Sequence, residues 1–137
     1  MSTWEETLSQ AGCRITESRR AVMTVLAQAE RPLVPQELLA LGLKLQATLS
    51  LVTVYRSLEL FEELSLVRRV HQDTKCQGYL LTAAGHRHVL ICEKCGRAVE
   101  FPGQDDLAAL IARVEERTGY QVKTHWLQLR GVCAECQ

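Results

Sequence analysis

Four cysteines in the C-terminal third of the chain are spaced as metal ligands. They form two CxxC pairs, Cys92 with Cys95 and Cys133 with Cys136. Two intervening residues let both thiolates of a pair reach one ion from a tight turn, and two such turns complete a tetrahedral site that suits zinc. The alternatives are redox-active dithiols, or cysteines buried as small hydrophobic residues. A complete four-cysteine site leaves no open coordination position, so we expect it to be structural and not catalytic.

Three histidines form a second set of candidate ligands. His86 and His88 alternate in a predicted strand, so their side chains share one face, and His125 lies in the last predicted strand. With a carboxylate such as Asp105, near the start of the intervening helix, they would suit a borderline divalent ion. The alternatives are a packed strand residue for His125 and a helix N-cap for Asp105.

A third set is weaker. His71 and Cys76 bracket the turn of a predicted hairpin, and Glu100 ends a predicted strand near the first cysteine pair. Together they could form an additional metal site between the two halves of the chain. The alternative is structural, because a turn cysteine and a strand-end glutamate need no function.

The N-terminal elements that accompany these residues are mostly helical. Thr16 is a candidate N-cap for a helix over residues 16–29, and Pro35 suits the first turn of a helix that Gly42 closes. A third helix is predicted over residues 50–64, from apolar positions spaced 3, 4 and 3 apart. Two short β-patterns over residues 66–71 and 77–82 predict a hairpin. Three helices followed by a hairpin is the order of a winged helix-turn-helix domain.

The remaining elements predict a second, smaller domain. Strands are expected over residues 86–91, 97–101 and 121–129, and a helix over residues 106–118. That helix is expected to turn four apolar residues inward, Leu107, Leu110, Ile111 and Val114. The fold class is therefore α+β. It comprises a winged-helix domain over residues 1–82, a hinge over 83–85, and a small α/β domain with a four-cysteine zinc site over 86–137.

The third helix has a polar face that could contact DNA. Its polar residues are Ser50, Thr53, Arg56 and Ser57, with Tyr55 beside them. Hydroxyls and an arginine on the N-terminal half of a helix suit phosphate and base-edge contacts in a major groove. The alternative is the solvated face of an ordinary core helix. Near the first predicted helix, Arg14, Arg19 and Arg20 could touch phosphates or be ordinary surface charges.

The overall composition restricts these interpretations. Sixteen basic and sixteen acidic residues cancel, with nine of each in residues 1–84, so any DNA-binding surface must be local and aided by dimerisation. No apolar run reaches transmembrane length, and the polar N-terminus argues against a signal peptide, so we expect a cytoplasmic protein without a membrane partner. The sequence contains no recognisable nucleophile–base pair or phosphate loop, so we expect neither an enzyme nor a small-molecule substrate.

Taken together, these motifs resemble the ferric uptake regulator (Fur) superfamily. The resemblance is carried by Thr53-Val-Tyr-Arg56, His86-x-His88-x-x-x-Cys92-x-x-Cys95-Gly96, Val99-Glu100-Phe101, the terminal CxxC pair and the opening Ala11-Gly-Cys-Arg-Ile-Thr16. It implies a homodimeric, metal-activated, DNA-binding regulator, usually a repressor. It also implies that residues 1–82 are the DNA-binding domain and that residues 86–137 are the dimerisation and metal-binding domain. It assigns Thr53, Tyr55 and Arg56 to DNA contacts, with Tyr55 and Arg56 touching DNA directly, and Arg14 to the minor groove. It assigns the CxxC pairs to structural zinc and His86, His88 and His125 to a second metal.

The sequence also departs from the family pattern. Arg87 and Val89 occupy positions that many relatives use for hinge ligands, and Ala108 stands where a glutamate is frequent, so Asp105 is expected in its place. Cys76 resembles a cysteine of zinc-sensing members, and a sulfur ligand favours zinc over ferrous iron. We therefore expect a zinc-sensing repressor of metal homeostasis, with Fe²⁺, Mn²⁺, nickel or peroxide sensing as alternatives. The alternative from another class is a zinc-stabilised adaptor that does not bind DNA.

Overall fold

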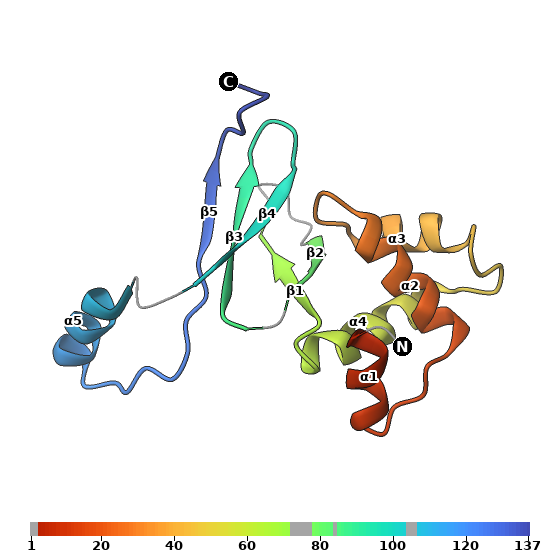
Figure 1. Ribbon diagram of the computed structural model, residues 1–137, viewed down its shortest axis with the longest axis horizontal. Helices are drawn as coiled ribbons and strands as arrows, with labels where there is room; N and C mark the ends of the chain where they lie inside the picture. Colours follow the sequence, from red (N-terminus) through yellow and green to blue (C-terminus); the bar gives the residue numbers. More distant parts are fainter. Residues whose placement is uncertain (1–2, 72–77, 84, 104–106) are drawn as a thin grey trace. The chain divides into compact units, whose positions relative to one another are not determined.

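The computed structural model describes residues 3–71, 78–83, 85–103 and 107–137. It divides into two compact units, Met1–Thr82 and Ala83–Gln137. Figure 1 shows the order of the elements along the chain. No helix among the described residues is both long and apolar enough to cross a membrane.

The first unit consists of four helices followed by a β-hairpin. Its elements are α1 (Thr3–Gln10), α2 (Glu17–Gln28), α3 (Pro35–Gly42), α4 (Leu51–Glu63), β1 (Val67–Val70) and β2 (Gly78–Leu81). The three predicted helices and the hairpin are present, and β1 pairs antiparallel with β2. The sequence did not predict α1, because a helix of 8 residues with few apolar positions shows no clear helical period. Leu8 of α1 is nevertheless fully buried, and Trp4 packs on the core.

Local hydrogen bonds set the starts of the helices. The Thr16 hydroxyl accepts the backbone N–H of Arg19 at 3.1 Å and begins α2. Pro35 is the first residue of α3. The Ser50 hydroxyl accepts the N–H of Thr53 at 3.2 Å and begins α4. Each hydroxyl satisfies one of the N–H groups that have no partner inside the helix.

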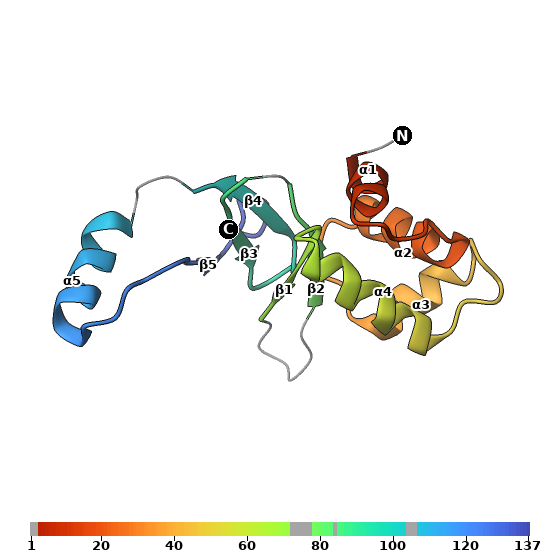
Figure 2. The same cartoon turned by 90° about the horizontal axis from the view of Figure 1, so that it is seen from below.

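The core of the first unit forms where α2, α3 and α4 meet, and Figure 2 shows these helices grouped together. From α4 it takes Val54, Leu58 and Phe61, which repeat at helical spacing. Ser57 shares this buried face and is 2% exposed, so its predicted place on the polar face is wrong. The 3.6-residue period puts residue 57 on the same side as residues 54, 58 and 61.

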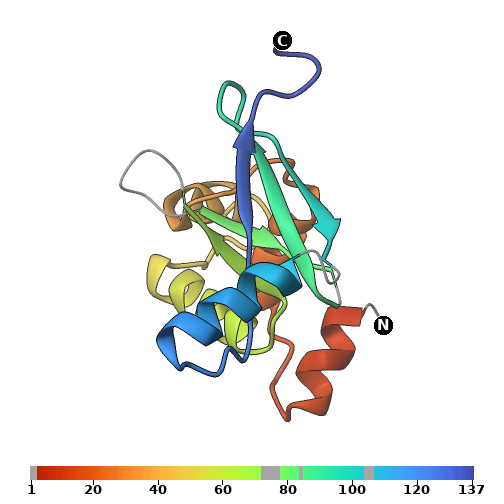
Figure 3. The same ribbon diagram turned by 90° about the vertical axis from the view of Figure 1, so that its left-hand side faces the viewer.

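The second unit is built on a three-stranded sheet. Its strands are β3 (Arg87–Cys92), β4 (Ala98–Pro102) and β5 (Gln128–Gly131), in the order β4-β3-β5. Figure 3 shows β3 flanked by the other two strands. The β3–β4 pair is antiparallel and the β3–β5 pair is parallel. The connection to the parallel strand contains α5 (Ala108–Thr118).

Two predictions for the second unit are wrong in detail. The last strand begins at Gln128 and not at residue 121, so His125 precedes it in an irregular segment. No described residue of α5 is buried, and Leu110 and Val114 are 47% and 40% exposed. An apolar stripe predicts that a helix face will be covered, but not whether the covering surface belongs to the same chain.

Candidate metal centres and nucleic-acid surface

One face of the central strand leads from the histidines to the cysteines. Alternate residues of a strand share a face, so His88, Leu90 and Cys92 lie in a row on β3. Across the sheet, His88 is paired with Phe101, and Leu90 with both Val99 and Leu129. The two groups of candidate ligands therefore lie at opposite ends of one short sheet, with an apolar band between them.

The four cysteines form one cluster. The Sγ atoms of Cys92, Cys95, Cys133 and Cys136 all lie within 4.8 Å of one another. Each CxxC pair closes a tight turn: the N–H of Gly96 donates to the carbonyl of Cys92 at 2.9 Å, and that of Cys136 to Cys133 at 3.0 Å. The parallel β3–β5 pairing brings the two turns together, because Cys92 is paired with Gly131. This is the arrangement that the spacing of the cysteines predicts for a tetrahedral site.

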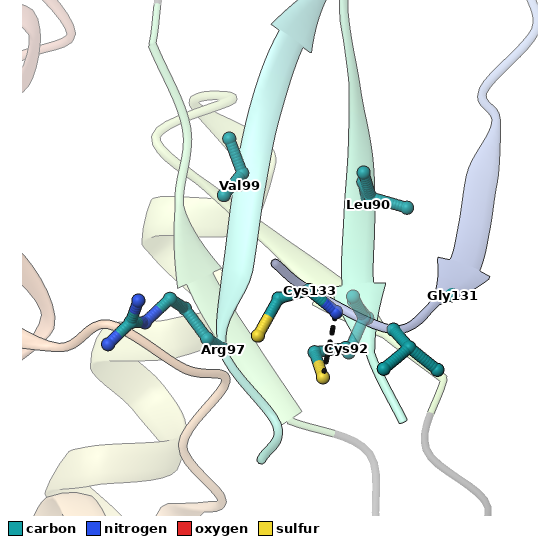
Figure 4. Close-up of a pocket in the computed structure, with 8 residues that line it drawn as sticks. Leu90, Cys92, Arg97, Val99, Gly131 and Cys133 are labelled. Carbon is teal, nitrogen blue, oxygen red and sulfur yellow. Dashed lines mark hydrogen bonds between the residues drawn. The ribbon is translucent and has the colours of Figure 1, made fainter. Parts of the chain in front are cut away.

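Hydrogen bonds distribute the protons of the cysteine cluster unevenly. The backbone N–H of Cys133 donates to Sγ of Cys92 at 3.4 Å, as Figure 4 shows, and the N–H of Cys95 does so at 3.5 Å. These two bonds lower the pKa of the Cys92 thiol from 9.0 to about 6. The hydrogen bond with Cys133, followed by burial, raises the pKa of Cys136 to about 12. One thiol of the cluster is therefore ready to bind a cation as thiolate, while another keeps its proton until a cation displaces it.

The three histidines form the second cluster. Nε2 of His86 lies 2.9 Å from Nε2 of His125, and one ring nitrogen from each of the three histidines lies within 4.8 Å of the others. His86 and His125 are 39 residues apart, the same offset as the parallel pair Val89 and Gln128. The register of β3 and β5 therefore brings them together, although His125 precedes β5.

The surroundings of His88 fix the orientation of its ring. The residue is fully buried, and its Nδ1 accepts the backbone N–H of Leu127 at 3.1 Å. Its ring lies against that of Phe101, with centroids 5.5 Å apart. The sequence did not identify either support, because both follow from strand register. Three converging imidazoles fit a borderline divalent ion such as zinc, and also iron or nickel.

Four other residues were predicted as metal ligands, and the structure describes two of them. Asp105 and Cys76 lie outside the described residues. His71 is exposed and follows β1 in the first unit, whereas Glu100 lies on β4 in the second. Within the second unit, the Glu100 carboxylate accepts the N–H of Ala83 at 2.9 Å and lies 3.7 Å from Nε of Arg87. The sequence did not predict this ion pair, in which the guanidinium of Arg87 lies beside the carboxylate that was expected to bind a metal.

The candidate DNA-contacting residues lie around the start of α4. Tyr55 and Arg56 are exposed. Ser50 and Thr53 are linked through their hydroxyls at 2.9 Å, so both take part in the helix cap. This leaves Tyr55 and Arg56 as the long side chains that project from the first turns of the helix.

Two arginines lie near the start of α2. Arg14 is exposed, whereas Arg19 is half-buried and donates from Nη1 to the carbonyl of Arg14 at 2.5 Å. Arg19 therefore fixes the backbone from which Arg14 projects.

Comparison with known proteins identifies the class. Residues 10–130 match the profile of the Ferric uptake regulator family. A peroxide operon regulator of Bacillus subtilis (strain 168) is 36% identical over 134 residues, which are 96% of this chain and 89% of that protein. The solved structure of a zinc-bound manganese uptake regulator is 31% identical, with a TM-score of 0.65 over 96% of this chain and 99% of that one. A zinc uptake regulator complexed with zinc and DNA has a TM-score of 0.73 at 22% identity, over 99% and 96% of the two chains, and shows a shared fold.

The molecule is thus a regulator of the winged-helix class and not an enzyme. The chain belongs to the ferric uptake regulator family. The expected fold class is confirmed, and so is the expectation of a metal-responsive, DNA-binding, dimeric regulator at the level of this family.

Proposed function

We propose that this protein is a cytoplasmic, zinc-sensing repressor that binds an operator as a homodimer and controls metal homeostasis. The observation that carries the proposal is the presence of two separate ligand clusters on one sheet. A four-cysteine site is complete by itself, whereas a three-histidine site keeps a position for a further ligand. The four-cysteine site therefore suits a permanently bound ion, and the three-histidine site an exchangeable ion.

In this proposal Cys92, Cys95, Cys133 and Cys136 hold a structural zinc ion. It joins the turn after β3 to the C-terminal turn that follows β5. A small unit with few buried residues gains much of its stability from such a link. Removal of this ion is expected to destabilise the second unit.

The regulatory ion is held by His86, His88 and His125, with Asp105 supplying the carboxylate. The three rings converge, with one ring nitrogen from each histidine within 4.8 Å of the others, so one ion could contact all three. Bound metal would then tie the start of β3, next to the proposed hinge at residues 83–85, to the segment before β5. This restricts the hinge, so less conformational entropy is lost when both DNA-binding units meet the operator.

DNA would be contacted from α4 and from the connection before α2. We assign Tyr55 and Arg56 to the major groove, with Ser50 and Thr53 at the helix start, and Arg14 to the backbone or minor groove, held by Arg19. Substitution of Arg56 by Ala should abolish operator binding while leaving the fold intact. Unchanged operator affinity would disprove the assignment of α4.

The exposed apolar surface of the second unit supports dimerisation. Leu90, Val99 and Leu129 are 42%, 56% and 43% exposed and are neighbours in the sheet. Leu110 and Val114 of α5 are also exposed, and groups of exposed apolar side chains often mark protein–protein interaction sites. A two-fold dimer would cover this surface and present two winged helices to a pseudo-palindromic operator.

The decisive experiment follows metal content and DNA affinity together. The purified chain is treated with a mild chelator, and its affinity is measured for a duplex selected from random DNA by the metal-loaded protein. We expect one zinc per chain to resist chelation and a second metal to leave together with DNA affinity. If DNA affinity is independent of chelation, the histidine cluster is not a regulatory site.

Relatives with other specificities make a second candidate worth testing. The Bacillus subtilis relative is a peroxide operon regulator, and a 31% identical structure is a manganese uptake regulator. We expect zinc to restore DNA binding to the chelated protein at a lower free concentration than Mn²⁺ or Fe²⁺, and hydrogen peroxide to leave the zinc-loaded protein bound. Selective restoration by Fe²⁺ followed by loss of binding in peroxide would instead make it a peroxide sensor.

A further inference from the structure

The end of β4 places a glycine against the histidine cluster. The antiparallel β3–β4 register pairs His88 with Phe101 and Arg87 with Pro102. The next pair along this ladder is His86 with Gly103, and the N–H of Gly103 indeed donates to the carbonyl of His86 at 2.8 Å. Because paired residues of an antiparallel ladder point to the same face, any side chain at position 103 would point toward the histidine rings.

The rings occupy the space that such a side chain would need. A Cβ atom built on Gly103 would lie 2.7 Å from Nε2 of His88 and 2.8 Å from Nε2 of His86, and closer still to Cδ2 of His86. Non-bonded heavy atoms prefer separations of about 3.5–4.0 Å, so even a methyl group cannot fit without displacing both rings. The two nitrogens that it would approach are candidate donor atoms of the cluster.

We propose that Gly103 is a positioning residue of the histidine metal site, and that its lack of a side chain sets the affinity for the regulatory metal. This rests on the proposed function, because it assumes that His86, His88 and His125 bind a metal. His88 has little freedom to move away, because it is fully buried between Phe101 and the N–H of Leu127. A side chain at position 103 would therefore separate the donor nitrogens.

The test compares Gly103→Ala with Gly131→Ala. Gly131 is paired with Cys92 in the same sheet, and a Cβ there would meet only Cδ1 of Leu90, at the ordinary distance of 4.0 Å. Each variant is loaded with Co²⁺, whose visible spectrum distinguishes thiolate from imidazole ligands. Groups that orient metal ligands typically change metal affinity by about 10–100-fold.

We expect Gly103→Ala to bind the second cobalt ion at least about tenfold more weakly, with an altered imidazole-type spectrum and an unchanged thiolate-type spectrum. Gly131→Ala should bind the second ion like the original protein. If Gly103→Ala and the original protein bind the second ion with equal affinity, the inference about Gly103 is wrong, while the proposed metal site is unaffected. If the original protein binds no second ion, the proposed metal site itself is wrong.

A rescue experiment covers the case in which Gly103→Ala folds poorly. The thermal stability of Gly103→Ala is compared in the original background and in a His86→Ala background, which removes the ring that a Cβ would approach most closely. We expect the alanine to cost clearly less stability when the ring of His86 is absent. An equal cost in both backgrounds would show that the glycine serves the backbone and not the histidines.

Discussion

The protons of the four-cysteine cluster are not distributed evenly. Two backbone N–H groups favour the thiolate of Cys92, whereas Cys136 shares its proton with neighbouring sulfurs. The pKa of Cys92 in the folded chain, about 6, is below its ordinary value of 9.0. The stabilisation from this thiolate is therefore fully present above pH 9.0 and is lost as the pH falls through about 6.

This difference predicts how many protons zinc displaces. A four-cysteine site is filled by four thiolates, and metal binding releases the protons that the thiols still hold. The thiol of Cys92 is already ionised at about pH 8, so zinc uptake at that pH should release fewer than four protons. At about pH 5 this thiol is protonated, so zinc uptake should release about one proton more than at about pH 8. Titration calorimetry with one equivalent of zinc, in buffers of different ionisation enthalpy, gives this count. An identical count at both pH values would contradict the assigned ionisation of Cys92.

Individual residues also show how much the sequence could predict about the site. The CxxC spacing predicts each half of the cysteine cluster, because ligand geometry within a tight turn is local, whereas the two halves meet through the β3–β5 pairing. The pairing of His86 with His88 is likewise local, since it needs only strand alternation. The positions of Leu127, Phe101 and Gly103 around these rings depend on the register between strands. Register is determined by contacts far apart in sequence, and none of these three residues was predicted as part of the site.

At the scale of elements, helices with local start signals and a buried face were predicted well. The helix start at Thr16 and the apolar face of α4 follow from caps and helical spacing, and both are present. The predictions failed for two elements of the second unit, the last strand and α5. The segment around His125 has the apolar content of a strand, but only Gln128–Gly131 pairs with β3, and the stripe of α5 has no covering surface among the described residues of one chain. Such outcomes depend on partners that the local pattern does not contain.

The separation of the two units predicts that they unfold independently. Phe61 is fully buried in the core of the first unit, and its replacement by Ala should cost about 3–5 kcal/mol, a large part of the stability of a small domain. The cysteine cluster lies wholly in the second unit, so zinc should be retained while α2 to α4 unfold. Amide hydrogen exchange, measured together with zinc content, tests this. The exposed Glu59 of α4, changed to Ala, serves as the control.

Loss of zinc together with the helices would show that the two units fold as one. Retention of native exchange protection in α2 to α4 would show that Phe61 contributes less than its burial indicates. The control separates loss of the core from a general effect of changing α4, because Glu59 lies on the exposed face of the same helix.

At the scale of the whole molecule, charge balance makes a few arginines important. The chain has no net charge, so long-range attraction to DNA is weak and binding depends on local contacts. Each phosphate contact contributes about 0.9 to the slope of log affinity against log salt concentration. If Arg14 contacts one phosphate in each protomer of a dimer, Arg14→Ala should reduce the slope by about 1.8.

The salt slope is measured with the selected duplex over a range of salt concentrations. Arg31→Ala is the matched control, because Arg31 is an arginine of the same unit that pairs with Glu37. Hydrogen bonding with Glu37 raises the pKa of Arg31, so this charge is already compensated within the protein. An unchanged slope for Arg14→Ala would mean that Arg14 contacts no phosphate, and a reduction of about 0.9 would indicate contact from a single protomer.

The final prediction concerns the coupling between metal and DNA. If the regulatory ion increases DNA affinity by some factor, DNA must increase affinity for that ion by the same factor, because both paths connect the same states. Typical couplings of about 1–3 kcal/mol correspond to factors of about 5–150. We expect the affinity of the histidine site for zinc to rise by the same factor when the selected duplex is present. The coupling should disappear in a His88→Ala variant that retains the zinc of the cysteine cluster. A metal affinity that does not change with DNA would mean that the ion at the histidines stabilises the chain without switching it.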